Sequence, residues 1–326
     1  MNIVQILSNT ASQILNPTTI GFALAAIGLS IHFGFTGLLN MGVAGFMAIG
    51  AYGFAISILT FGLPWWVAVL IGLAASAVFA LVLGVPTLRL RGDYLAIVTI
   101  AAAEVVRLLF LSTAFKDVTG SADGLSGFHN GFRDSNPLPE GKFGFGPWVY
   151  TSDTWWVIII GVVLTAVAAL FTWSLMRSPW GRVIKGIRED EDAVRALGKN
   201  VFSFKMQALV IGGVITAMGG IITAMGTNVN PNVYVTSQTF FIWTALLLGG
   251  AATIFGPILG AVLFWVVRAF LSNLLPALVS IGWLPFLSRE QSQMLVFILV
   301  GVALMLLVIF RPQGILGNKK ELTFVK

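Results

Sequence analysis

A charge-dense segment interrupts a chain that is otherwise almost free of charge. Residues 177–205 read RSPWGRVIKGIREDEDAVRALGKNVFSFK and hold 7 of the 19 Lys/Arg and 4 of the 13 Asp/Glu. Long apolar runs flank this segment on both sides. A helix this polar is not stable in lipid, because burying its charged side chains there is expensive. We therefore expect the segment to project into water, where a partner can bind it.

The composition places the rest of the chain in a membrane. Hydrophobic residues make up 57% of the 326 residues, charged residues 10%, and the mean hydropathy is +0.92. Soluble domains carry about 25% charged residues. A chain of this length holds about eight to ten spans of about 20 residues each. The predicted fold is an all-α, polytopic transmembrane helix bundle with some broken or short helices, forming one domain over residues 1–326.

Nine apolar stretches predict the spans, and several of them are short and interrupted by glycine. Residues 1–15 are expected to form a further, shallow helix. The run GGAATIFGPILGA (249–261) favours a broken helix, because Gly256-Pro257 removes a donor and disfavours helix at the preceding residue. The predicted spans lie near 18–36, 41–61, 64–86, 93–111, 155–176, 205–226, 238–252, 257–276 and 291–310.

The distribution of basic residues predicts the orientation. If residues 177–204 face the cytoplasm and the nine spans alternate, thirteen Lys/Arg lie inside and four lie outside. Cytoplasmic loops of membrane proteins carry the excess of basic residues. We therefore expect a multi-pass protein of the cell membrane in which 177–204 and the tail 311–326 are cytoplasmic and the loop 112–154 is extracytoplasmic.

Missing motifs exclude several functions. There is no GxxxxGK[ST] run, so the chain has no phosphate-binding loop of its own. With no cysteine, two histidines and no HExxH, neither a metal site nor a cofactor is expected. His32 is interpreted as a hydrogen-bonded packing residue of a span, and His129 as a solvated loop residue. The basic residues lie in loops between spans, so nucleic acid is not an expected partner.

The charged segment has the pattern of a helix with a defined start and end. Ser178-Pro179 is typical of a helix N-terminus, and Gly198 of a C-terminal stop. Two interpretations stay open. The helix could rest its apolar face on the membrane bundle as a solvated loop, or it could insert into a groove of a cytoplasmic subunit. The apolar positions at helical spacing are Val183, Ile184, Ile187, Val194 and Leu197.

Six segments, in this order, resemble the ABC-importer permeases for branched-chain amino acids, most of all the M-type subunit with the longer outer loop. Two positions depart from the usual pattern: Val43-Ala44 stands where many relatives have His or Ser, and Ser121-Ala122 replaces a common glycine. The resemblance runs from about residue 20 to residue 317. The segments are GLLNMGVAGFMAIGAY (37–52), LRLRGDYLAIVTIAAAEVVR (88–107), TGSADGL (119–125), RSPWGRVIKGIREDEDAVRALGKNV (177–201), GGAATIFGPILGA (249–261) and RPQGILG (311–317).

The resemblance implies a non-catalytic permease subunit that works by alternating access in the lipid membrane. Its implied partners are a second, homologous permease subunit in a heterodimer, two cytoplasmic ATPase subunits and an extracytoplasmic solute-binding protein. The implied substrates are branched-chain or related hydrophobic amino acids. Urea and short-chain amide permeases share these motifs and stay an alternative. An ion-coupled secondary carrier is a further alternative, but Glu104 is the one intramembrane carboxylate that could serve it.

The residues themselves, together with the resemblance, suggest where the partners and the substrate bind. The outer loop 112–154, locally acidic and too long for a simple connector, is either solvated or a docking surface for the binding protein. Glu104 can pair with Arg107 at i, i+3 as a structural pair, or it can face the amino group of a zwitterion in the pathway. Other candidates for the pathway are Tyr94, Thr99, Gly42 and Gly45. Candidates for ATPase coupling are Ile184, Ile187, Arg188, Glu189, Asp190, Glu191, Asp192, Ala193, Val194 and Gly198.

The orientation can be tested in this cysteine-free chain with single cysteines. Ser178→Cys is expected to be protected from an impermeant thiol reagent added to intact cells, because the basic asymmetry places it inside. Ser126→Cys, in the outer loop, is the control and is expected to react. Labelling of the cysteine at position 178 in intact cells would refute the topology.

Overall fold

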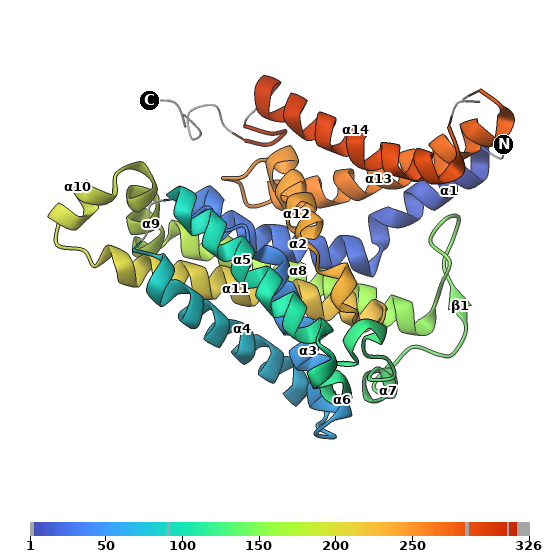
Figure 1. Cartoon of the computed structure of the whole chain (residues 1–326), viewed down its shortest axis with the longest axis horizontal. Coiled ribbons are helices and arrows are strands. Elements are labelled where there is room, and N and C mark those ends of the chain that lie inside the picture. The colour runs from blue at the N-terminus through green and yellow to red at the C-terminus, as the bar shows by residue number, and fades with distance from the viewer. Residues whose placement is uncertain (1–2, 90–91, 284–286, 312, 318–326) are drawn as a thin grey trace.

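The computed structural model describes residues 3–89, 92–283, 287–311 and 313–317, so Pro312 and residues 318–326 of the predicted tail lie outside the described part. Fourteen α-helices and one two-stranded hairpin make up this part (Figure 1). The helices are α1 Ile3–Ser12, α2 Pro17–Leu29, α3 Val43–Leu59, α4 Trp65–Thr87, α5 Gly92–Leu111, α6 Lys116–Thr119, α7 Asn130–Arg133, α8 Ser152–Arg177, α9 Pro179–Glu189, α10 Glu191–Ala196, α11 Val201–Gly226, α12 Thr236–Gly249, α13 Gly256–Ile281 and α14 Arg289–Phe310. The strands are β1 Lys142–Phe143 and β2 Tyr150–Thr151.

The long helices confirm an all-α, polytopic membrane protein. Seven helices of the described part are long and apolar enough to cross a membrane: α2 with its continuation to Phe35, α4, α5, α8, α11, α13 and α14. The apolar helices α3 and α12 are shorter, with 17 and 14 residues. These nine helices correspond to the nine predicted spans. Helix α1 has 10 residues, too few to cross a membrane, and packs against α13.

The core of the bundle consists of α2, α3 and α11. In the most apolar window of Pro17–Phe35, 89% of the residues are buried, against 12% in α14. Glycine lets these central helices meet backbone to backbone, because a Cβ at Gly219 would overlap the carbonyl oxygen of Gly21 and a Cβ at Gly220 that of Met47. Such close approach is how helices associate in lipid, where no hydrophobic force drives them together.

Two of the helices are broken inside the bundle. Helix α2 ends in a π-helical turn, Ser30–Phe35, and α3 begins only at Val43. Helix α12 ends at Gly249 and α13 begins at Gly256, which confirms the break predicted within 249–261. The two breaks touch, because the hydroxyl of Ser30 donates to the carbonyl of Ala251 at 2.6 Å.

The last described residues cover the second break. The backbone N–H groups of Ile315 and Leu316 donate to the carbonyls of Leu248 and Gly249 at 2.9 and 3.0 Å. The break at the end of α12 therefore obtains backbone partners from a segment that follows α14. Irregular backbone at membrane depth is stable only when its polar groups are satisfied within the protein.

The loop 112–154 packs on the bundle, so the interpretation of His129 as a solvated residue is wrong. His129 is 8% exposed, and its Nε2 lies 3.1 and 2.9 Å from the carbonyl oxygens of Ala224 and Thr227 at the end of α11. Leu125 and Val229 exchange two backbone hydrogen bonds of 2.7 and 3.0 Å. These contacts hold the loop against the bundle, at the opposite end from α9 and α10 (Figure 1).

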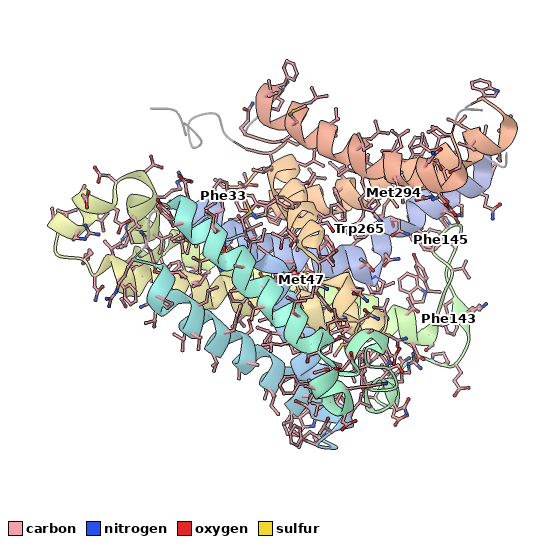
Figure 2. All side chains as sticks on the ribbon, viewed as in Figure 1. Phe33, Met47, Phe143, Phe145, Trp265 and Met294 are labelled. Carbon is pink, nitrogen blue, oxygen red and sulfur yellow. The ribbon has the colours of Figure 1, made fainter. Side chains whose placement is uncertain are left out.

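The hairpin of the outer loop is fastened to the first helix. Trp148 Nε1 donates to the carbonyl of Ala11 at 3.1 Å, and the hydroxyl of Tyr150 donates to that of Ser12 at 2.7 Å. Burial raises the pKa of Tyr150, which keeps its hydroxyl protonated as a donor. Phe143 and Phe145 extend from the hairpin and are 40% and 73% exposed (Figure 2). The hairpin thus presents aromatic surface at this end of the bundle.

Two glycine substitutions are expected to differ in their effect on stability, because only one of the two glycines lies at the contact between α12 and α13. A Cβ at Gly260 would overlap the carbonyl of Ala245, whereas a Cβ at Gly301 in α14 meets nothing within 4 Å. Gly260→Ala is therefore expected to destabilise the chain by about 1–3 kcal/mol through overpacking. The measurement is the unfolding temperature of the detergent-solubilised chain, which is expected to fall. Gly301→Ala, the control, is expected to be neutral or stabilising by up to about 1 kcal/mol. Equal unfolding temperatures for the two variants would contradict this packing.

Candidate functional site

The charged segment forms two helices, not the single helix expected over 179–197. Ser178 caps α9, because its hydroxyl accepts from the N–H of Gly181. Pro179 lies in the first turn of the helix. The chain then breaks at Asp190, which has extended backbone angles (φ −155°, ψ 103°). The Asp190 carboxylate accepts from the N–H groups of Asp192 and Ala193, each at 3.0 Å, and so starts α10. The expectation missed this because an aspartate that caps a helix and one on its surface look alike in sequence.

The end of the segment agrees with the prediction. Gly198 has φ +76°, a left-handed conformation that glycine adopts without strain, and no helical residue follows until Val201. Because Ser178 caps α9, a cysteine at the exposed Asp192 would report the accessibility of this side with less disturbance than one at Ser178.

The apolar side chains of the segment pack inward. Ile184, Ile187 and Val194 are 0%, 4% and 9% exposed within the core of the chain itself. They are not positioned to meet a partner's groove, as had been expected, because burying them against the bundle already removes their apolar area from water. The surface left open by the segment is different. Its exposed residues include Glu189, Asp192 and Leu197, of which Leu197 is 78% exposed.

Salt bridges within α10, and one from α10 to α11, hold the end of the charged segment. Arg195 pairs with Glu191 at 2.9 Å and with Asp192 at 2.6 Å. Glu191 also binds the ammonium of Lys205 in α11, whose side chain is 14% exposed. The Glu191 carboxylate is therefore engaged within the chain, and its position is structural.

Arg188 points toward the membrane bundle. Its side chain is 9% exposed, and its Nη1 donates to the carbonyl of Gly34 at 2.6 Å. The same guanidinium binds Glu189 Oε1 through Nη2 at 2.6 Å and through Nε at 3.1 Å. Arg188 thus connects the exposed carboxylate of Glu189 with the π-helical turn after α2.

A polar cavity of about 940 Å³ lies between this segment and the adjoining ends of α4 and α5. Basic side chains outnumber acidic ones in its lining, which gives the cavity a positive balance. Its charged lining residues are Arg89, Arg188, Arg195, Lys199, Lys205, Glu191 and Asp192.

Asn40 organises the break between α2 and α3, a role that the sequence analysis missed. It is fully buried, and its side-chain oxygen accepts from the N–H of Gly42 at 2.8 Å. Its amide nitrogen faces His32 Nδ1 at 3.1 Å. His32 Nε2 lies 3.0 Å from the carbonyl of Leu209 and must donate to it, so Nδ1 accepts from Asn40. This confirms His32 as a hydrogen-bonded packing residue. One polar residue in the apolar run GLLNMG was the available signal for Asn40.

Three pathway candidates lie together at one helix contact. Thr99 Oγ1 accepts from the N–H of Met41 at 2.9 Å, and Thr99 is fully buried. A Cβ at Gly42 would overlap the Thr99 carbonyl, and one at Gly45 would lie 2.9 Å from Ala103 Cα. Gly42, Gly45 and Thr99 therefore allow α3 and α5 to approach closely. The fourth candidate, Tyr94, is 62% exposed on another face of α5 and does not join this contact.

The fifth candidate, Glu104, forms an ion pair on α5. Arg107 holds it through Nε at 3.0 Å to both carboxylate oxygens and through Nη2 at 2.5 Å to Oε1. The Arg107 side chain is 15% exposed and that of Glu104 38%. Glu104 lies about two turns before α5 ends at Leu111, and 17% of this span is buried. A carboxylate this exposed at membrane depth is expensive in lipid, so this part of α5 needs a polar or protein neighbour.

Broken helices inside a multi-pass membrane bundle, with a charged helical segment between two spans, are typical of membrane transport proteins. Residues 12–310 match the family model described as branched-chain amino acid transport system / permease component. The chain belongs to this family of ABC transporter permeases, which confirms the family predicted from the motifs.

Known relatives differ in what they transport. The chain is 33% identical over 309 residues to the high-affinity branched-chain amino acid transport system permease protein LivM of Salmonella typhimurium, covering 91% of this chain and 68% of that protein. It is 28% identical over 285 residues to the guanosine ABC transporter permease protein NupQ of Bacillus subtilis, covering 78% and 82%. Among solved structures, PsaBC from Streptococcus pneumoniae in complex with Fab matches 93% of this chain and 92% of that chain at 16% identity, with a TM-score of 0.41, too low to carry an argument.

The ion pair on α5 can be tested by separating charge balance from substrate binding. Glu104→Gln alone strands Arg107, which costs about 3–5 kcal/mol if the pair is buried in the assembly and about 1 kcal/mol or less if it is exposed. Glu104→Gln/Arg107→Gln leaves no unpaired charge, so it is expected to accumulate at wild-type level. If the Glu104 carboxylate binds substrate, uptake by this double variant is expected to fall at least about tenfold. Wild-type uptake by the double variant would show that the pair is only structural.

Proposed function

We propose that this chain is the membrane permease subunit of an ATP-driven importer for branched-chain or related hydrophobic amino acids. It works by alternating access, together with a second homologous permease subunit, two cytoplasmic ATPase subunits and an extracytoplasmic solute-binding protein. It has no phosphate-binding loop, so hydrolysis takes place on the separate ATPase subunits. Membership of an ABC permease family supports the association with ATPase and binding subunits.

The open surface of α9 and α10 is the observation that carries this proposal. Leu197 is a large apolar side chain that is 78% exposed, and the same segment carries the exposed carboxylates of Glu189 and Asp192. Protein interfaces combine an apolar centre with a polar rim, and a segment that offers both kinds of side chain to solvent suits such a contact. The segment connects α8 to α11, so a force on it acts directly on two long helices. We therefore assign the ATPase contact to this exposed surface, with Ile184, Ile187 and Val194 supporting it from beneath.

Helix α5 supports the pairing with a second permease subunit. Its outer face exposes Ile97, Val105 and Leu109 together with the half-exposed Glu104. Lipid suits the apolar side chains but not the carboxylate. A second permease subunit packed against α5 would cover the apolar side chains, and a hydrated pathway between the two subunits would solvate the carboxylate. Glu104 then faces the pathway, where it can bind the amino group of a zwitterionic substrate.

The orientation and the outer contacts complete the proposal. The basic residues of 177–204 support a cytoplasmic position for this segment and an extracytoplasmic one for the loop 112–154. The outer loop is held in place by its contacts with α11 and α1. A fixed surface of this kind suits docking of the solute-binding protein, and the exposed Phe145 of the hairpin is its most prominent apolar residue.

Uptake measurements decide among the substrate classes. Cells that express the complete transporter are expected to take up labelled leucine, isoleucine or valine in an ATP-dependent manner. An excess of urea, acetamide or guanosine is expected not to compete. Competition by urea or acetamide would favour an amide permease, and competition by guanosine a transporter of the kind named for the relative in Bacillus subtilis. Uptake that persists without ATP hydrolysis but collapses with the ion gradient would favour a secondary carrier.

Leu197→Asp is expected to separate the chain from its ATPase subunits. Introducing a charge at an apolar interface residue costs about 2–4 kcal/mol of binding, which is enough to abolish copurification of the ATPases. The exposed position predicts normal accumulation of the chain itself. Val149→Asp is the matched control, because Val149 is also exposed, at 51%, but lies in the outer loop. If both variants retain the ATPases equally, the ATPase contact lies elsewhere.

A further inference from the structure

The π-helical turn after α2 is the place where three parts of the chain meet. Its Gly34 carbonyl accepts from Arg188 of α9. A Cβ on the same Gly34 would overlap the carbonyl of Ala251, in the break between α12 and α13. The Ser30 hydroxyl donates to that Ala251 carbonyl at 2.6 Å. One turn of helix therefore contacts both the charged segment and the second helix break.

The Arg188 side chain is enclosed on the bundle side. Gly37, at φ +75°, lies against its stem, and a Cβ there would be 3.1 Å from Arg188 Cγ. Beyond the guanidinium, Glu189 is 66% exposed to solvent. Arg188 thus spans from a water-exposed carboxylate to a backbone carbonyl of the broken helix. Its planar guanidinium can hold both acceptors at once, which a lysine ammonium on a flexible stem cannot do in the same geometry.

The same turn leads to the polar contacts of the first break. Residues 36–42 follow directly, and there Asn40 binds His32 while the N–H of Met41 binds Thr99 of α5. A continuous set of contacts therefore joins Gly34 to α5, which carries Glu104, and to Ala251. Packed cores switch between discrete arrangements more readily than they deform continuously.

We propose that Arg188 is a positioning residue that couples the ATPase-contacting surface of α9 and α10 to the two helix breaks of the bundle. When the ATPase displaces Glu189, the guanidinium moves with it and changes its hold on Gly34. The proposal rests on the proposed importer function. It assigns Arg188 to transmission of the movement, whereas the exposed Leu197 and Asp192 provide attachment.

The test compares Arg188→Gln, Arg188→Lys and Arg182→Gln in the complete transporter, purified with its ATPase subunits and reconstituted in liposomes. Arg182 is the matched control, because it is an exposed arginine of the same helix. The readouts are copurification of the ATPases, basal ATPase activity, stimulation by loaded binding protein, and uptake. Copurification and stimulation of the wild type test the importer function itself, independently of Arg188.

Arg188→Gln is expected to copurify normally and to keep basal ATPase activity, while stimulation and uptake fall about tenfold, within the range typical of coupling between two sites. Arg188→Lys is expected to retain only part of the stimulation, and Arg182→Gln all of it. Normal stimulation in Arg188→Gln would overturn the proposal, and so would loss of copurification, which would make Arg188 an attachment residue. If Arg188→Gln does not accumulate, Arg188→Lys decides, because wild-type stimulation in that variant also refutes the coupling role.

Discussion

Satisfying the backbone inside lipid is the constraint on which this structure depends. An unbroken helix meets it without help, but α2 and α12 both end within the bundle. At the first break, Asn40 accepts from Gly42 N–H and Thr239 accepts from Ala44 N–H at 3.1 Å, while Trp243 donates to the Asn40 carbonyl. At the second break, Ser30 and the residues after α14 supply the partners. Polar side chains and backbone groups from other segments therefore take the place of helical hydrogen bonds.

These partners also explain what the sequence could and could not predict. Hydropathy identified all nine apolar helices, because lipid imposes length and composition on each of them separately. The break near Gly256-Pro257 was predictable from local backbone chemistry. The roles of Asn40 and His129 were not, because Trp243, which donates to the Asn40 carbonyl, and the Ala224 carbonyl, which meets His129, lie far along the chain. Local pattern cannot say which carbonyl a buried side chain will meet.

The charged segment shows the same limit in a different form. Its start at Ser178, its end at Gly198 and its amphipathic pattern follow from residue types and spacing. The direction in which the apolar side chains face does not follow from residue types and spacing. The pattern indicates that one side of the helix is covered, and the structure shows that the chain's own bundle covers it. The inward orientation of Arg188 belongs to the same class of tertiary information.

The backbone contact that closes the second break has a consequence for biosynthesis. The carbonyl groups of Leu248 and Gly249 obtain their partners only after Ile315 and Leu316 have been made. Translation proceeds from the N-terminus, so every earlier span can be inserted while this part of the bundle is still open. A chain truncated anywhere before residue 315 keeps that opening permanently. The helix bundle is thus closed at this break only when the segment after α14 has docked on the end of α12.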